Sequence, residues 1–193
     1  PTSSASGRSR RSSPHGEMGL PRPGRVLVAE GELAARVAEL GAAIARDYAR
    51  TAPVLVGVLQ GAVPFIADLM RHLPIDVTLD FVRASSYGAV TTSSGAVRLI
   101  VDLTVDLADR DVLIVDDIVD TGLTLDALKR MFQARGPRSV RTCVLLDKGG
   151  RRQVDIPIDY VGFTIPNVFV VGYGLDYDGL YRNLPHVAAL DGV

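Results

Sequence analysis

The sequence predicts an α/β protein whose mainly parallel, twisted sheet is flanked by helices. Short apolar segments of strand length alternate along the chain with longer segments in which apolar residues recur at helical spacing. Two of the short segments, residues 52–61 and 111–116, contain uninterrupted apolar runs, which are typical of strands buried on both faces. Strands that alternate with helices in this way form parallel sheets with right-handed crossovers.

The first half of the chain contains three expected strands and two expected helices. Residues 25–30 form a short strand, and residues 31–49 follow as a helix because apolar side chains recur at helical spacing. Residues 52–61 form a buried strand that turns sharply at its final glycine. A second helix at residues 62–73 and a strand of alternating polarity at residues 75–85 complete this half.

A long polar loop at residues 86–96 opens the second half, because it is rich in Gly, Ser and Thr and has no period. A helix is expected at residues 124–135. The remaining expected strands are residues 97–103, 111–116 and 139–148, with two shorter candidates at 159–166 and 167–176. The chain shows no internal repeat and no sign of a second folded domain.

Composition limits the classes of protein to which the chain can belong. Its 193 residues suffice for one domain with a substantial core, and 47% hydrophobic residues indicate a globular protein. A net charge of −1 provides no field to recruit nucleic acid or an anionic membrane. Cys143 is the only cysteine, which excludes an internal disulfide framework. No apolar run approaches the roughly 20 residues that span a bilayer, so we expect a cytoplasmic protein without membrane or nucleic-acid partners.

Residues 1–24 differ from the rest of the chain. They are rich in Ser, Pro, Gly and Arg and lack apolar periodicity, so we expect a disordered tail before a single domain at residues 25–193. The segment lacks the apolar central region of a secretory signal. The chain begins with Pro1, and Met18 could be the natural start. The arginines of this segment could contact nucleic acid, but a solvated tail is the favoured interpretation.

Residues 112–125, VLIVDDIVDTGLTL, place three carboxylates within five positions directly after an apolar run. A helix cap would explain Asp120 or Thr121 alone, but it leaves the pair Asp116 and Asp117 unexplained. Adjacent carboxylates near a buried strand end stay ionised only with a counter-charge, a metal ion or hydroxyl donors. Ribose hydroxyls and Mg²⁺ would both serve.

Thr121, Gly122 and Thr124 form the expected first turn of the helix that follows. Free backbone N–H groups, the positive end of the helix dipole and two hydroxyls make a pocket suited to one phosphate. Carboxylates for sugar hydroxyls beside amides for phosphate indicate a phosphorylated ribose. A nucleoside triphosphatase would need a G-x-x-x-x-G-K-[ST] loop, which the sequence lacks. A phosphoacceptor domain would carry its acidic pair near the start of the fold.

Three polar features each follow a different expected strand. They are the acidic stretch, the turn at Gln60 and Gly61, and Lys148. Ligands of open α/β sheets bind outside the carboxyl ends of the strands. We therefore expect these three features to line one cleft.

Residues 112–125 resemble the phosphoribosyl-pyrophosphate signature of type I phosphoribosyltransferases, which is a long and specific motif. The segments VGVLQGAVPFIADL, RASSYG, LLDKGGRR and IPNVFVVGYGLDYDGLYRNLPHV resemble, in order and spacing, those of the hypoxanthine-guanine branch of that family. The similarity runs from about Val26 to the C-terminus. It implies the type I phosphoribosyltransferase fold with a small hood subdomain from the terminal regions, and a homodimer or homotetramer.

The resemblance also implies a purine salvage reaction, in which phosphoribosyl pyrophosphate and a 6-oxopurine, hypoxanthine or guanine, give IMP or GMP and pyrophosphate. Asp116 and Asp117 would hold the ribose hydroxyls and the associated Mg²⁺. Asp120 would act at the purine N7 as general base, a role for which burial would bring its pKa nearer neutrality. The 5-phosphate would be held by Thr121, Gly122, Leu123 and Thr124.

Selection of the nucleobase is implied for three further residues. Lys148 would donate to the 6-oxo oxygen, and because an ammonium cannot accept a hydrogen bond, a 6-amino purine should be rejected. Phe169 would stack on the purine, and the Val170 backbone would meet its edge. Without the resemblance, Lys148 would be interpreted as a surface lysine and Phe169 as ordinary core.

The pyrophosphate would be held by groups from two regions of the chain. Asp176 would coordinate the Mg²⁺ bound to it, and Arg182 would contact it directly, as a guanidinium suits phosphate oxygens. Gln60 and Gly61 would form the pyrophosphate turn, where the family has a non-proline cis peptide.

Ser86 and Tyr87 match the family's mobile flap, whose closure would exclude water from the reactive ribose centre. The sequence departs from the family at three positions. Gln60 stands where Lys is usual, Leu123 where Lys or Asn is frequent, and Asp116 where Glu is frequent. Activity survives the first two changes if those positions act through backbone amides, although the missing cation at Gln60 could weaken pyrophosphate binding.

A second class of protein stays open at this point. Some regulators of this fold bind phosphoribosyl pyrophosphate without catalysis and act on DNA or RNA. Such a regulator would need a nucleic-acid module or a basic face, and residues 1–24 are too few for a winged helix. The presence of Asp120, Lys148 and Tyr87 favours the enzyme. The three histidines are scattered and receive no role.

Overall fold

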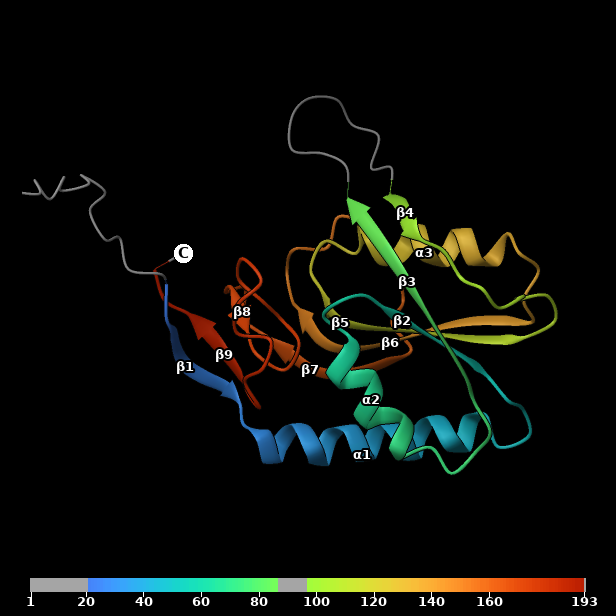
Figure 1. The fold of residues 1–193 in the computed structure, drawn as a ribbon, viewed down its shortest axis with the longest axis horizontal. Coiled ribbons are helices and arrows are strands. Elements are labelled where there is room, and N and C mark those ends of the chain that lie inside the picture. Colours follow the sequence, from blue (N-terminus) through green and yellow to red (C-terminus); the bar gives the residue numbers. More distant parts are fainter. Residues whose placement is uncertain (1–20, 87–96, 193) are drawn as a thin grey trace, which may run out of the picture.

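A computed structural model describes residues 21–86 and 97–192, which form a central six-stranded sheet with helices on both faces (Figure 1). The strand order is β4-β3-β2-β5-β6-β7. These strands are β2 (Val54–Val58), β3 (Thr78–Ser86), β4 (Val97–Val101), β5 (Asp111–Val119), β6 (Ser139–Lys148) and β7 (Tyr160–Ile165). All neighbours run parallel except β3 and β4, which are antiparallel. The predicted mainly parallel α/β sheet is confirmed.

Two hydrophobic cores lie on opposite faces of this sheet. In β5, Leu113 faces the core under α1 (Glu30–Asp47) and α2 (Val63–Arg71). The next residue, Ile114, faces the core under α3 (Leu123–Gln133), on the other side of the sheet in Figure 1. Neither side chain is exposed to solvent. Burial on both faces explains why this strand is an uninterrupted apolar run in the sequence.

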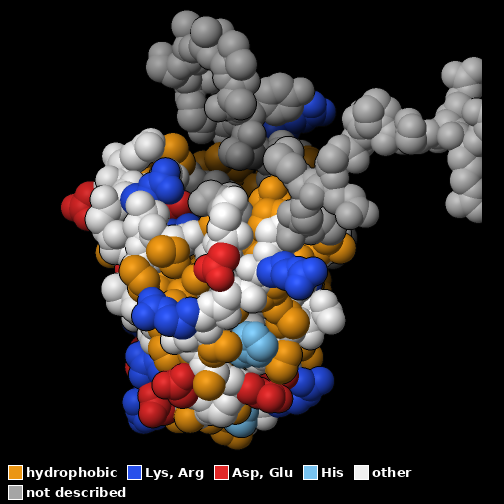
Figure 2. Space-filling model, turned by 90° about the vertical axis from the view of Figure 1, so that its left-hand side faces the viewer, with side chains coloured by type: hydrophobic (Ala, Val, Ile, Leu, Met, Phe, Trp, Pro, Cys, Tyr) orange, Lys and Arg blue, Asp and Glu red, His pale blue; other side chains and the backbone are white. Residues whose placement is uncertain are grey.

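A second sheet of three antiparallel strands lies beside the first, in the order β1-β9-β8. It joins β1 (Pro23–Val28) from the start of the domain to β8 (Val170–Val171) and β9 (Val187–Leu190) from its end, so the predicted hood of terminal segments is present. β1 begins and ends two residues earlier than the predicted strand 25–30. β9 was not predicted, because four residues show no period. Figure 2 shows hydrophobic, basic and acidic side chains interspersed on this side of the molecule.

β5 and the candidate strand at residues 167–176 differ in length from their predictions for reasons that the structure shows. β5 was expected to end at Asp116 but continues to Val119, because its pairing with β6 persists through Val119 opposite Asp147. The candidate strand 167–176 is reduced to the two residues of β8, because the backbone turns into left-handed conformations directly after it. Both differences arise from contacts between strands, which a local pattern does not contain.

Three further points concern the N-terminal segment, the end of α2 and the possibility of a membrane span. Residues 1–20 of the predicted disordered tail lie outside the described residues, so that expectation stays a prediction. His72 directly follows the last residue of α2. Within the part of the chain that the structure describes, each helix is too short or too polar to cross a membrane.

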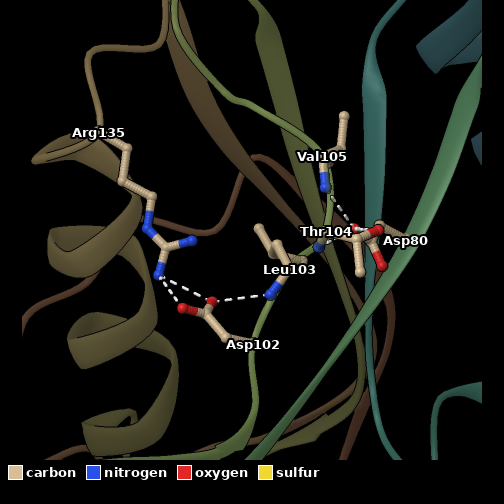
Figure 3. Close-up of polar contacts among 6 residues, drawn as sticks. All are labelled: Asp80, Asp102, Leu103, Thr104, Val105 and Arg135. Carbon is tan, nitrogen blue, oxygen red and sulfur yellow. Dashed lines mark hydrogen bonds and ion pairs between the residues drawn. The ribbon is translucent and has the colours of Figure 1, made fainter.

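Asp80 on β3 fixes the connection between β4 and β5 (Figure 3). Its Oδ2 accepts hydrogen bonds from the backbone N–H of Thr104 at 2.7 Å and of Val105 at 3.0 Å, and from the Thr104 hydroxyl at 3.0 Å. Asp102 lies in the connection between β4 and β5. Both of its carboxylate oxygens accept a hydrogen bond from Nη2 of Arg135, each at 2.8 Å. The connection is therefore tied both to the sheet and to the end of α3.

Replacing Asp80 should lower stability in a pH-dependent way. Burial alone would raise the pKa of Asp80, but hydrogen bonds from Val105, Phe81 and Thr104 outweigh it and hold the pKa below its ordinary value. A lowered pKa stabilises the fold above the unfolded value of about 3.9, and this contribution is lost as the pH falls through the folded value. We expect Asp80→Ala to lower the melting temperature by about 2–4 °C at pH 7, corresponding to about 1 kcal/mol for this partly exposed group.

The matched control is Asp102→Ala, which removes a more exposed carboxylate that lies in the connection to which Asp80 is bonded. Thermal unfolding of both variants at pH 7 and pH 3 measures the difference. An equal loss in the two variants, or a loss for Asp80→Ala that does not shrink at pH 3, contradicts the assignment.

Candidate active site

The carboxyl ends of β2, β5 and β6 meet at one edge of the central sheet, because these strands are parallel neighbours. The turn after β2 lies directly against β5, since a Cβ added to Gly61 would be 1.6 Å from Oδ2 of Asp117. At the end of β6, Nζ of Lys148 lies 3.7 Å from Oδ2 of Asp120. The predicted convergence of the turn, the acidic stretch and the lysine is therefore present.

Asp116 and Asp117 lie within β5, at the point where it separates from β2. The pairing of β5 with β2 ends at Val115, whereas its pairing with β6 continues. The backbone N–H of Asp117 donates to Oδ1 of Asp116 at 3.0 Å, and that of Ile118 donates to Oδ1 of Asp117 at 2.9 Å. At this point Asp116 and Asp117 each line a pocket at the edge of the sheet.

Burial raises the pKa of both carboxyls in this pair. For Asp116, which is 7% exposed, desolvation is the main cause and the neighbouring charge of Asp117 adds to it, so its pKa is well above the ordinary value. For Asp117, desolvation outweighs the opposing effects of its hydrogen bonds and of Arg182. A nearby cation or hydroxyl donors would lower the pKa of both carboxyls and so favour their ionised forms.

Asp120 follows β5 and lies between two cations. Oδ2 is the oxygen 3.7 Å from Lys148, and Oδ1 lies 3.3 Å from Nε of Arg151. Lys148 is only 8% exposed, so the interpretation of a surface lysine is wrong. Arg151 was not predicted, because a charged residue in an irregular loop carries no pattern that reveals its partner.

The loop from Thr121 to Thr124 forms a small cup at the start of α3. Gly122 has φ of +83°, and the helix begins at Leu123, one residue before the predicted start. The cup has a volume of about 130 Å³. Its lining residues are Asp116, Ile118, Val119, Asp120, Thr121, Gly122, Thr124 and Leu125. Backbone N–H groups and the positive end of the helix dipole at this place favour an anion.

A second pocket of about 220 Å³ lies on the other side of Asp117. It is lined by Asp117, Ile118, Lys148, Phe169, Val170, Leu175 and Asp176. Phe169 is 41% exposed, so the interpretation of it as ordinary core is wrong. Its ring meets the Tyr177 ring edge to face, at 5.7 Å between centroids. An exposed aromatic ring opposite a buried lysine suits a flat, polar heterocycle.

The turn after β2 and the segment after β8 enclose a third pocket of about 430 Å³, which includes Gln60 and Arg182. Nη2 of Arg182 lies 2.7 Å from Oδ1 of Asp176, whose Oδ2 accepts the backbone N–H of Gly179 at 2.7 Å. The peptide bond between Leu59 and Gln60 is cis, as expected for this turn.

The three predicted metal ligands are divided between two pockets. Asp117 and Asp176 line the 220 Å³ pocket, and Asp116 lines the adjoining cup. Among residues 21–86 and 97–192, no three His, Cys, Asp or Glu side chains form a group that could hold a metal ion by themselves. This set suits a cation such as Mg²⁺, which uses one or two carboxylates and completes its coordination with water and substrate oxygens.

The two predicted flap residues lie at the limit of the described chain. Ser86 is the last residue of β3, and Tyr87 lies outside the described residues. Their role as a flap stays a prediction.

Comparison with known proteins gives matches over most of the chain. The family of the phosphoribosyl transferase domain matches residues 27–178. The chain is 48% identical over 166 residues to a hypoxanthine-guanine phosphoribosyltransferase of Bacillus subtilis (strain 168), which covers 86% of this chain and 92% of the relative. Two solved structures are similar in fold. A hypoxanthine-guanine phosphoribosyltransferase of Bacillus anthracis, with HEPES in its active site, has a TM-score of 0.84 at 44% identity and covers 88% and 99% of the two chains. A hypoxanthine phosphoribosyl transferase of Trypanosoma cruzi has a TM-score of 0.83 at 43% identity, and the match covers 87% of this chain and 91% of that chain.

The buried acidic pair should destabilise the ligand-free protein at neutral pH. A group whose pKa is raised by folding contributes its stability fully below the unfolded pKa, and the contribution is lost as the pH rises through the folded pKa. We therefore expect Asp116→Asn to raise the melting temperature in metal-free buffer at pH 8, by about 2–4 °C for each kcal/mol gained. The gain should shrink at pH 4.5.

Asp155→Asn serves as the control, because Asp155 is an exposed aspartate of the loop after β6. Thermal unfolding of both variants and of the unchanged protein at the two pH values measures the effect. A lower melting temperature for Asp116→Asn at pH 8, or a gain that does not depend on pH, contradicts the prediction.

Proposed function

The chain belongs to the phosphoribosyl transferase family, and from this premise we propose how its residues act. It is a purine salvage enzyme that transfers the 5-phosphoribosyl group from phosphoribosyl pyrophosphate to hypoxanthine or guanine, giving IMP or GMP and pyrophosphate. One observation carries this conclusion: a buried acidic pair, an amide-lined cup and a buried lysine beside an aspartate lie together at one edge of the sheet.

The sugar phosphate occupies the cup and the acidic edge in this proposal. Backbone N–H groups of residues 121–124 hold the 5-phosphate, as helix N-termini hold anions elsewhere. Asp116 and Asp117 accept hydrogen bonds from the ribose hydroxyls, which favours their ionised forms. The family uses a divalent metal ion. Mg²⁺ at Asp116 and Asp117 on the ribose side, and Mg²⁺ at Asp176 on the pyrophosphate side, would complete their coordination with water and substrate oxygens and offset the negative charge of the pyrophosphate group.

The nucleobase occupies the 220 Å³ pocket. Lys148 donates to the 6-oxo oxygen of hypoxanthine or guanine, Phe169 stacks on the ring, and the Val170 backbone meets the base edge. The 6-amino group of adenine would face the Lys148 ammonium with a donor against a donor. Sites whose buried polar groups are left unpaired reject such analogues by orders of magnitude.

Asp120 acts as the general base in this arrangement. It takes the proton from the purine N7. The other imidazole nitrogen of the purine, N9, forms the bond to the ribose carbon from which pyrophosphate departs. Oδ2 of Asp120 lies 3.7 Å from Nζ of Lys148, which supports a base and a 6-oxo donor that act on the same edge of the purine. Positive charge that develops on the ribose is stabilised by the adjacent carboxylates Asp116 and Asp117.

Gln60, Gly61 and Arg182 hold the departing pyrophosphate. Arg182 is paired with Asp176, and its guanidinium would exchange this partner for phosphate oxygens when substrate binds. Gln60 offers an amide where the family usually has a lysine, so this turn acts chiefly through its backbone. We further propose a homodimer or homotetramer in the cytoplasm.

The direct test is an assay of the purified protein with phosphoribosyl pyrophosphate, Mg²⁺ and each of three bases. We expect pyrophosphate release with hypoxanthine and guanine, and a rate with adenine lower by orders of magnitude because Lys148 lacks an acceptor there. Tight binding of phosphoribosyl pyrophosphate without turnover would instead indicate a regulator of the same fold.

Asp120→Asn tests the general base. We expect kcat to fall by at least ~10²-fold, which is the usual contribution of general-base catalysis. Asp120 borders the cup, but its proposed contact is with the purine N7 and the 5-phosphate is held by backbone N–H groups, so the KM for phosphoribosyl pyrophosphate should change little. Asp155→Asn controls for the loss of one negative charge, and an unchanged kcat in Asp120→Asn removes Asp120 from the mechanism.

A further inference from the structure

The loop after β6, residues 149–158, is docked on the cup that precedes α3. The backbone N–H of Gln153 donates to the carbonyl of Thr121 at 2.9 Å. A Cβ added to Gly122 would lie 3.1 Å from Cγ2 of Val154, so the two segments are in close contact. Nη2 of Arg152 pairs with Oδ1 of Asp147 at 3.0 Å. The segment that directly follows Arg151 is therefore held against the cup.

The Arg151 side chain extends from this loop to Asp120. Its Nε lies 3.3 Å from Oδ1, an oxygen that is buried and accepts no hydrogen bond from the described residues. Nη1 of Arg151 donates to Oδ1 of Asn167 at 3.5 Å. Asn167 precedes Phe169 by two residues, so one guanidinium contacts both the aspartate and the segment that carries the aromatic ring.

The two oxygens of Asp120 have different cationic partners. Oδ2 lies near Lys148 and Oδ1 lies near Arg151. When Lys148 donates to a 6-oxo oxygen, it gives up part of its interaction with Oδ2. Arg151 then remains as the charge partner of the carboxylate, and it holds the oxygen that does not face the base.

We propose that Arg151 is a positioning residue for phosphoribosyl transfer, which orients the Asp120 carboxylate so that Oδ2 faces the purine N7. This inference rests on the proposed role of Asp120 as general base. Arg151 acts through Asp120 and touches neither the sugar phosphate nor the pyrophosphate group. Its removal therefore affects the proton transfer and leaves the binding of phosphoribosyl pyrophosphate intact.

Steady-state kinetics of Arg151→Ala with hypoxanthine test the proposal. We expect kcat to fall about tenfold, since misplacing a catalytic group by 1 Å can cost about 10²-fold, while the KM for phosphoribosyl pyrophosphate stays within about twofold. The matched control is Arg130→Ala, which removes an exposed arginine of α3 that pairs with Asp126 and should leave both constants unchanged. An unaltered kcat in Arg151→Ala, or a rise in the KM for phosphoribosyl pyrophosphate in place of a fall in kcat, overturns the proposal.

A double-mutant cycle separates this proposal from the proposed function. If Arg151 acts through Asp120, adding Arg151→Ala to Asp120→Asn causes no further loss of kcat. Full additivity of the two losses shows that Arg151 acts independently and overturns the positioning role. A normal kcat in Asp120→Asn alone refutes the general base itself, whereas a slow Asp120→Asn with a normal Arg151→Ala refutes only the role of Arg151.

Discussion

Two carboxylates buried side by side in β5 are the constraint on which the rest of the site depends. Desolvation raises the pKa of both Asp116 and Asp117, so the fold contains two neighbouring carboxyl groups whose ionised forms are disfavoured by burial. Their position follows from the sheet, because β5 leaves β2 after Val115 but stays paired with β6. The turn after β2 packs closely against Asp117, since residue 61 is a glycine and a Cβ there would meet the Asp117 carboxylate. Stability given up at such a place is a common feature of functional sites.

Much of the central sheet could be predicted from the sequence, because its determinants are local. The buried strands are continuous apolar runs, and α1 shows its apolar side chains at helical spacing, with Leu33, Val37 and Ile44 all buried. The acidic pair and the Thr-Gly-x-Thr turn are also local, so the edge of the sheet at which the acidic stretch, the turn after β2 and Lys148 meet could be identified. Lys148 was placed correctly because it ends a predicted strand.

The rest depends on contacts between distant segments. β9 has four residues and is a strand only because β1 and β8 flank it. β5 is three residues longer than its apolar run indicates, because β6 continues to pair with it. The contact of Arg151 with Asp120 joins an irregular loop to the end of another strand. No periodicity or composition encodes such pairings, since they arise when separate elements pack together.

The pairing of β1 with β9 brings the two ends of the domain together. Pro23 lies opposite Leu190, and the backbone N–H of Asp191 donates to the carbonyl of Arg22 at 3.2 Å. Domains with neighbouring ends tolerate circular permutation. A short linker between these ends would preserve the small sheet, and new termini could be opened in a solvent-exposed connection far from the catalytic edge. The connectivity of the strands could therefore be changed while their arrangement in the two sheets is kept.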